Sequence, residues 1–248
     1  MTTVVLRPAI LILMAIDLIA FDADDTLWHN ETIFVTAQEK FRKLLAKYHS
    51  KEWIDHKLYE TEARNLQHFG YGVKGFTLSM IETAIELSEG RISGAEIRAV
   101  IELGKEMLKA PVALLDGVQE CIEELLKCYR LMVITKGDLF DQEAKFAKSG
   151  LGERFWRIEV VADKTQKTYE RILEKYDVDP QRFLMVGDSL KSDILPVVAV
   201  GAHAVHIPYQ TTWIHERVSP SELEEKQFVR LEHIRLLPKF LAQRHRPA

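Results

Sequence analysis

The 248-residue sequence contains only two cysteines, Cys121 and Cys128, which lie on one predicted helix. Their spacing separates them by about 10 Å along a helix axis, which is too far for a disulfide bond. The sequence also lacks an excess of basic residues, because its net charge is −4. Free thiols fit a reducing cytoplasm, and the charge excludes the basic surface expected of a nucleic-acid-binding protein.

The sequence also has no apolar run long enough to span a membrane. Residues 4–20 are apolar except for Arg7, Pro8 and Asp17, and these three residues interrupt the run. No cleavage site of small residues follows, so we expect neither a secretory signal nor a membrane partner. Met14 precedes the first predicted strand, and residues 1–13 are therefore interpreted as a dispensable extension or the product of an upstream start codon.

No strand pattern occurs between Asn30 and Pro111, where apolar residues recur at helical spacing. Four helices are predicted there. The first has Asn30 as its N-cap, the second runs from Lys51 to about Gln67, the third spans 76–85, and the fourth begins with a capping box of Ser93 and Glu96. A glycine-rich turn at 70–75 separates the second helix from the third. Residues 31–111 therefore form a predicted helical module.

Outside this module, predicted strands and helices alternate along the chain. The strands are expected at 15–21, 131–134, 156–161, 183–186 and 202–207, and the helices at 118–127, 140–148, 168–176, 189–199 and 233–243. This alternation is typical of an α/β fold with a doubly wound parallel sheet. We expect a core domain of residues 1–30 and 112–248 with an inserted helical domain of residues 31–111.

Three carboxylates, Asp22, Asp24 and Asp25, directly follow the first predicted strand. Open α/β sheets bind ligands at the carboxyl ends of their strands, which is where Asp22 is expected. Neighbouring carboxylates repel one another unless a cation lies between them, and oxygen ligands suit Mg²⁺. The alternative at this point is a solvated acidic turn.

Further polar residues follow the other predicted strands. They are Thr135, Lys136 and Gly137 after the second strand, Lys164 and Lys167 after the third, and Asp188 and Asp193 after the fourth. The carboxyl ends of parallel strands share one edge of the sheet. We therefore expect a single site formed by Asp22, Asp24, Thr135, Asp188 and one of the two lysines.

The motifs resemble those of the haloacid dehalogenase-like (HAD) superfamily, and within it the phosphatases. The segment Asp22-Ala23-Asp24-Asp25-Thr26-Leu27 resembles the first motif, D-x-D-G-T-L, with Asp25 in place of the usual glycine. The strand that ends at Thr135 resembles the second motif, and residues 187–193 resemble the fourth, G-D-x-x-x-x-D. The third motif is a lysine, and its spacing to the fourth motif favours Lys164, which leaves Lys167 on the surface at a helix start.

The resemblance implies an enzyme that hydrolyses phosphoric monoesters with Mg²⁺. Asp22 is expected to attack phosphorus and form an aspartyl-phosphate, and Asp24 to act as general acid and base. Thr135 would bind a phosphoryl oxygen, and Lys164 would offset negative charge. The implied metal ligands are Asp22, the backbone carbonyl of Asp24, and Asp188. Asp193 is expected to orient Lys164 or a metal-bound water, with direct ligation as the alternative.

The helical module resembles the all-helical cap of this superfamily, which implies a small phosphorylated metabolite as substrate. Residues considered for substrate contact are Trp28, Lys74, Lys136 and Gly137, with hinge packing as the alternative for Trp28 and a solvated turn for Lys74. A zinc site is not expected at His203, His206 and His215, because His203 and His206 are three apart in a predicted strand and so face opposite sides.

Two other functions stay open at this stage. One is a phosphotransferase or mutase of the same superfamily, which would use the same aspartates. The other is a catalytically silent binding protein, against which the complete set of motif residues argues. Haloacid dehalogenases lack an acid two residues after the nucleophile, so Asp24 favours a phosphatase. The sequence predicts neither the physiological substrate nor the oligomeric state.

Overall fold

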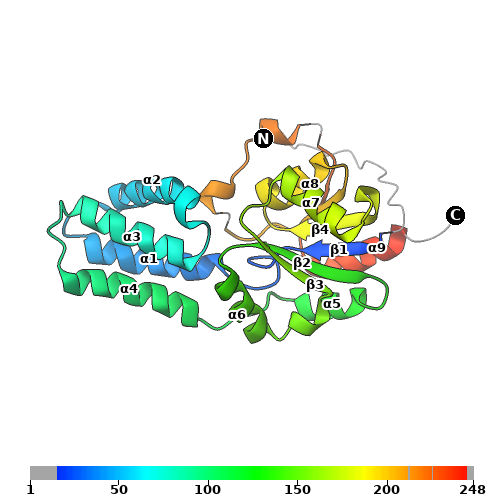
Figure 1. Cartoon of the computed structure of the whole chain (residues 1–248), viewed down its shortest axis with the longest axis horizontal. Coiled ribbons are helices and arrows are strands. Elements are labelled where there is room, and N and C mark those ends of the chain that lie inside the picture. Colours follow the sequence, from blue (N-terminus) through cyan, green and yellow to red (C-terminus); the bar gives the residue numbers. More distant parts are fainter. Residues whose placement is uncertain (1–15, 212, 225, 245–248) are drawn as a thin grey trace.

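A six-stranded parallel sheet, in the order β3-β2-β1-β4-β5-β6, forms the centre of the larger part of the molecule (Figure 1). The computed structural model describes residues 16–211, 213–224 and 226–244, so Met14 and residues 1–13 lie outside the described part. The strands are β1 (Leu18–Phe21), β2 (Arg130–Lys136), β3 (Arg157–Val161), β4 (Phe183–Gly187), β5 (His203–His206) and β6 (Val229–Arg230). The last strand was not predicted, because two residues show no periodicity.

Helices cover both faces of this sheet. They are α5 (Val118–Leu125), α6 (Leu139–Ser149), α7 (Gln166–Tyr176), α8 (Leu195–Ala199) and α9 (Leu237–Arg244). Alternate side chains of β1 point to opposite faces, so Ile19 and Phe21 pack with α5, α6 and α9, and Leu18 and Ala20 pack with α7 and α8. The predicted doubly wound α/β fold is confirmed. The predicted helix 189–199 is divided, because a π-helical segment (Leu190–Ile194) precedes α8.

Four helices between β1 and α5 lie beside the sheet rather than on it (Figure 1). They are α1 (Glu31–Leu45), α2 (Lys51–Phe69), α3 (Val73–Leu87) and α4 (Gly94–Lys109), and we call them the helical unit. The unit has its own apolar core, which includes Phe41, Leu58 and Met80. The capping box of Ser93 and Glu96 is present as predicted.

The predicted turn at 70–75 is shorter in the structure. Gly72 has a φ of 114°, a backbone conformation that favours glycine, and α3 begins at the next residue. Lys74 therefore lies in the first turn of a helix and not in a glycine-rich loop.

The N-terminus of α1 is capped from a distance by Asp25. Its carboxylate accepts hydrogen bonds from the backbone N–H groups of Asn30, at 2.9 Å, and Glu31, at 3.0 Å. Asn30 is the N-cap residue, as predicted, but its side chain makes no capping hydrogen bond, because its Oδ1 accepts a hydrogen bond from Lys145 instead. Asp25 has a φ of 62°, which explains why glycine is usual at this position of the motif. Asp25 thus ties the helical unit to the turn after β1.

Replacing Asp25 by alanine is expected to lower the free energy of unfolding by about 1–2 kcal/mol, because the cap is lost and alanine, unlike glycine, does not relieve the positive φ. Glycine at this position should cost less than alanine, since it relieves the backbone while losing the same cap. Asparagine, which keeps one acceptor oxygen, should cost least. Urea unfolding of the three variants gives the order, and a glycine variant less stable than the alanine variant would contradict this role.

Both cysteines are free thiols, Cys121 buried in α5 and Cys128 exposed beyond its end. His203 and His206 both lie in β5, and their Nε2 atoms contact the backbone carbonyls of Gln181 and Asp188. Within the described residues, no helix combines the length and the apolar character needed to cross a membrane.

Candidate active site

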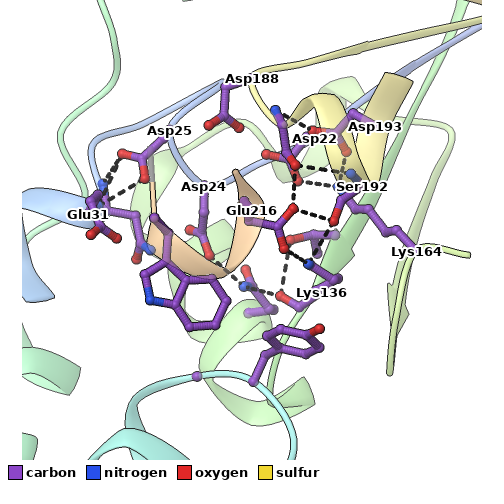
Figure 2. A pocket seen from close by; sticks show the side chains of 18 of the residues that line it. Asp22, Asp24, Asp25, Glu31, Lys136, Lys164, Asp188, Ser192, Asp193 and Glu216 are labelled. Carbon is purple, nitrogen blue, oxygen red and sulfur yellow. Dashed lines mark hydrogen bonds and ion pairs between the residues drawn. The ribbon is translucent and has the colours of Figure 1, made fainter. Parts of the chain in front are cut away.

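A cavity of about 150 Å³ lies at the carboxyl edge of the sheet, next to the helical unit (Figure 2). Its lining includes every residue that the sequence predicted for catalysis, metal binding or support, namely Asp22, Asp24, Thr135, Lys164, Asp188 and Asp193. They come from the ends of β1, β2 and β4, from the loop after β3 and from the π-helical segment after β4. The structure therefore brings these six residues together.

Lys164 is the buried cation of the site. Its side chain is 1% exposed, and its ammonium group donates to the carboxylates of Asp22 and, at 2.6 Å, Asp193. Lys167 is exposed in the first turn of α7. The structure thus places Lys164, and not Lys167, beside the predicted nucleophile. Asp193 contacts Lys164 directly, as the orienting role requires.

Three carboxylates, those of Asp22, Asp188 and Asp193, form an acidic cluster in which one oxygen of each lies within 4.8 Å of the others. Gly187 leaves the space that the Asp193 carboxylate occupies, because a Cβ at position 187 would lie 2.3 Å from an oxygen of Asp193. The carboxylate of Asp24 is not part of the cluster. The predicted use of its backbone carbonyl as a metal ligand stays a prediction.

Burial is the largest cause of the pKa shifts of Asp22 and Asp188 in the acidic cluster. It raises the pKa of Asp22 to about 7, although Lys164 acts in the opposite direction. Burial, followed by the charges of Asp22 and Asp193, raises the pKa of Asp188 well above its usual value. The positive charge of Lys164 therefore does not balance the negative charge of the three carboxylates. Because all three offer oxygen ligands at short range, the residues present fit a hard divalent cation such as Mg²⁺.

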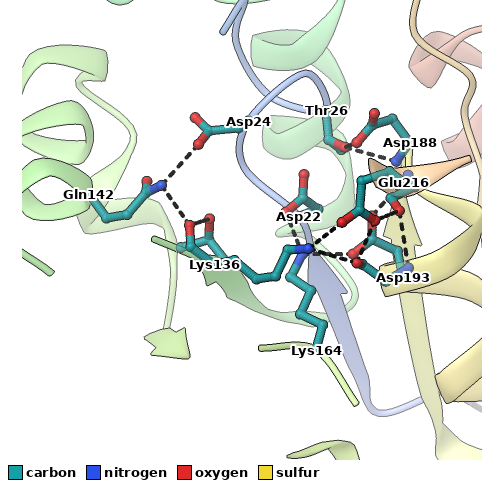
Figure 3. Close-up of polar contacts among 12 residues, drawn as sticks. Asp22, Asp24, Thr26, Lys136, Gln142, Lys164, Asp188, Asp193 and Glu216 are labelled. Carbon is teal, nitrogen blue, oxygen red and sulfur yellow. Dashed lines mark hydrogen bonds and ion pairs between the residues drawn. The ribbon is translucent and has the colours of Figure 1, made fainter. Parts of the chain in front are cut away.

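Asp24 occupies a different part of the cavity, where three donors hold its carboxylate. Trp28 Nε1 lies 2.7 Å from one carboxylate oxygen, Gln142 Nε2 lies 2.9 Å from the other, and Lys145 Nζ lies 3.0 Å from both. Figure 3 shows Asp24 turned toward Gln142 and away from Asp188. The fixed orientation of this carboxylate is what a group that transfers protons to a bound substrate needs.

The charge of Lys145 is secured by the same contacts. Burial alone would lower the pKa of Lys145, but the nearby carboxylates of Asp24 and Asp141 more than compensate and raise it. The side chain is 14% exposed, and its ammonium also donates to Asn30 Oδ1 at 2.9 Å. Lys145 therefore links Asp24 to the start of the helical unit.

Of the four residues considered for substrate contact, Lys136 and Gly137 line the cavity and Trp28 and Lys74 do not. Trp28 is 1% exposed, packs edge-on against Phe146 with ring centroids 4.8 Å apart, and donates to Asp24. Lys74 is half exposed and pairs with Asp138 at 2.8 Å. Substrate contact therefore stays a prediction for Trp28 and Lys74, and the contacts described agree with the alternatives of packing for Trp28 and an exposed position for Lys74. Trp28 supports Asp24 from the core, and Lys74 joins α3 to the start of α6.

Sequence reasoning missed several residues of the cavity. Gln142 and Lys145 lie three apart in α6 and so share one helix face, a spacing that could have revealed them. Glu216 follows β5 in a long polar segment that carries no motif. Its carboxylate lies 2.5 Å from Lys136 Nζ and 2.5 Å from Ser192 Oγ, and it also accepts from Ser189.

A doubly wound sheet with an acidic cluster, a buried lysine and a hydroxyl at its strand ends defines an enzyme of the HAD type. The family model described as haloacid dehalogenase-like hydrolase matches residues 16–201, three quarters of the chain. The chain belongs to this family of hydrolases.

Among solved structures, the chain is similar to a haloacid dehalogenase-like hydrolase from Xanthomonas campestris, with 40% identity and a TM-score of 0.82 over 93% of this chain and 92% of that one. It shares the fold of a 2-haloacid dehalogenase from Pseudomonas syringae, with 22% identity and a TM-score of 0.60 over 92% of this chain and 99% of that one. A curated relative, pyrimidine 5′-nucleotidase YjjG of Escherichia coli (strain K12), is 26% identical over 82% of this chain and 89% of that protein.

Proposed function

We propose that this protein is a Mg²⁺-dependent phosphatase that hydrolyses a small phosphorylated metabolite through an aspartyl-phosphate on Asp22. The observation that carries the proposal is the carboxylate of Asp24, which three donors hold in the same cavity as Asp22. An ester oxygen that leaves phosphorus needs a proton, and Asp24 can supply it. Displacement of a halide from a carbon atom needs no such proton, so Asp24 has no task in a dehalogenase.

In the first step, a carboxylate oxygen of Asp22 attacks phosphorus and the bond between phosphorus and the ester oxygen breaks. Asp24 transfers its proton to that leaving oxygen. Thr135, a buried residue near the end of β2, donates its hydroxyl hydrogen to a phosphoryl oxygen, and the Lys164 ammonium offsets charge on Asp22 and the phosphoryl group. The products of this step are the alcohol and a phosphorylated Asp22.

In the second step, Asp24 acts as a base and takes a proton from water. The water oxygen attacks phosphorus, the bond to Asp22 breaks, and inorganic phosphate leaves with Asp22 restored. Asp22, Asp188 and the backbone carbonyl of Asp24 would hold Mg²⁺, with Asp193 holding Lys164. When bound, the ion supplies positive charge that stabilises the phosphoryl oxygens.

The helical unit serves in this proposal as a cap, the inserted domain of residues 31–111, over the core of residues 1–30 and 112–248. Phe34 of α1 and Tyr71 and Gly72, which join α2 to α3, line the cavity together with the core residues. Such a cover excludes bulk water from the aspartyl-phosphate. A cavity of about 150 Å³ favours a small metabolite over a protein or nucleic acid.

Metal dependence tests the proposal with p-nitrophenyl phosphate. Activity should fall by about a hundredfold or more in a chelator and return on addition of Mg²⁺, because the acidic cluster loses the charge that stabilises the phosphoryl group. Activity that persists in the chelator would contradict the metal role. No release of p-nitrophenol, and no hydrolysis in a panel that includes pyrimidine 5′-nucleotides, would favour a silent binding protein.

The same assay separates hydrolysis from phosphoryl transfer. A phosphatase releases inorganic phosphate and p-nitrophenol in equal amounts, even when sugars are added as acceptors. A phosphotransferase or mutase would release less phosphate than p-nitrophenol, because part of the phosphoryl group would pass to the sugar.

A further inference from the structure

The segment after β5, residues 208–211 and 213–217, forms one wall of the cavity. Thr211, Trp213 and Glu216 belong to its lining, although the segment lies far along the chain from the motif residues. Figure 1 shows its short helix, Ile214–Glu216, in orange beside α2. The segment therefore reaches from the core to the helical unit.

Contacts on both sides hold this segment. The His215 ring stacks on Tyr59 of α2 with centroids 4.5 Å apart, and Trp213 meets Tyr71 edge-on at 5.8 Å. On the core side, Lys191 Nζ donates to the backbone carbonyl of His215 at 2.8 Å. These contacts place Glu216 beside the core residues Lys136 and Ser192 (Figure 2). Glu216 also accepts a hydrogen bond from Ser189.

Lys136 is held in one orientation by three contacts. Its ammonium lies 2.5 Å from Glu216 Oε1, 2.8 Å from Ser192 Oγ and 4.2 Å from the centre of the Tyr71 ring. The side chains of Lys136 and Glu216 are only 14% and 12% exposed. A lysine has a flexible stem, so without these contacts its ammonium would sample many positions.

Glu216 keeps its charge at this buried position. Burial alone would raise the pKa of Glu216, but Lys136 and the hydroxyl groups of Ser189 and Ser192 lower it to about 2. Glu216 therefore remains ionised at any pH used in an assay. A lysine without this counterion would be drawn toward the carboxylates of the acidic cluster, which lies in the same cavity.

We propose that Glu216 is a positioning residue, which fixes the ammonium of Lys136 on the cavity wall so that Lys136 can bind the anionic part of the substrate. Lys136 directly follows Thr135, the residue assigned to a phosphoryl oxygen, and both residues line the cavity, with the Lys136 ammonium over the Tyr71 ring between α2 and α3. This inference rests on the proposed function for the identity of the ligand, but the contact between Glu216 and Lys136 can be tested separately.

The kinetic test compares Glu216→Gln, Lys136→Met and the double variant with p-nitrophenyl phosphate. Each single variant should raise KM about tenfold, the value of one hydrogen bond to a charged group, and leave kcat within about twofold. The double variant should be no worse than Lys136→Met, because Glu216 acts through Lys136. An unchanged KM in Glu216→Gln, or effects that multiply in the double variant, would overturn the proposal.

Glu224→Gln is the matched control, since Glu224 is an exposed glutamate further along the chain after β5 and lines no part of the cavity. It should leave KM and kcat unchanged. If Glu216→Gln does not fold, Glu216→Asp takes its place. The aspartate keeps the negative charge on a shorter side chain, so Glu216→Asp should raise KM by less than Lys136→Met does. An unchanged KM in Glu216→Asp would overturn the proposal.

The second readout needs no activity. Acetic anhydride labels free lysine amines, and mass spectrometry of the digested protein reports the rate at Lys136. In Glu216→Gln this rate should rise several-fold, while Lys145, which is held by Asp24, should keep its rate as an internal reference. Faster labelling in a protein that hydrolyses no phosphate ester would sustain the positioning role and refute the phosphatase. Unchanged labelling would refute the positioning role.

Discussion

Replacing Asp22 by asparagine is expected to reduce turnover of phosphate esters by a factor on the order of 10⁴ or more, as the loss of a nucleophile does in other enzymes that form covalent intermediates. An amide oxygen is a weak nucleophile, and the substitution also removes one of three carboxylates from the acidic cluster. Steady-state hydrolysis of p-nitrophenyl phosphate with Mg²⁺ provides the measurement.

A matched control is Asp17→Asn, one residue before β1, because Asp17 forms an exposed ion pair with Arg182 outside the cavity. Its activity should equal that of the unmodified protein. Urea unfolding establishes that Asp22→Asn is folded. A folded Asp22→Asn protein that retains more than a few per cent of the activity would contradict the role of Asp22 as nucleophile.

Replacing Asp24 by asparagine has the second-largest expected effect, and the size of that effect should depend on the leaving group. An alkyl phosphate needs a proton on its leaving oxygen, so its turnover should fall by about 10²–10⁴-fold. The p-nitrophenolate ion leaves without a proton, so the first step with p-nitrophenyl phosphate should remain fast. The second step should be slow, because Asp24 no longer takes a proton from water.

Rapid mixing of Asp24→Asn with p-nitrophenyl phosphate should therefore give a burst of one p-nitrophenol per chain, followed by slow turnover. The unmodified protein is the reference for the same substrates. An equal loss for alkyl and nitrophenyl esters, with no burst, would show that Asp24 does not transfer the proton.

The core of the site was predictable because it follows from local rules. Each strand of a parallel sheet ends at the same edge, so Asp22, Thr135 and Asp188 had to approach one another once their strands were recognised. The spacing to the fourth motif was enough to choose Lys164, whose burial against Asp193 agrees with that choice. Periodicity likewise located α1 to α4 to within a few residues.

Other features depend on how distant segments meet, which periodicity does not encode. Glu216 reaches Lys136 only because the chain after β5 crosses from the sheet to the helical unit. Asp25 caps α1 because the turn after β1 folds back toward Asn30 and Glu31. Trp28 follows Asp22 closely in sequence, yet its side chain turns into the core. Proximity in sequence to Asp22 therefore does not place a side chain in the cavity lining.

The most direct test of the central claim is the mass of the Asp24→Asn protein, quenched in acid just after the burst with p-nitrophenyl phosphate and Mg²⁺. The account predicts one added phosphoryl group per chain, located on the peptide that contains Asp22, and no such group when Asp22→Asn is added to the same protein. Release of p-nitrophenol without an adduct, or an adduct on a different residue, would contradict the account.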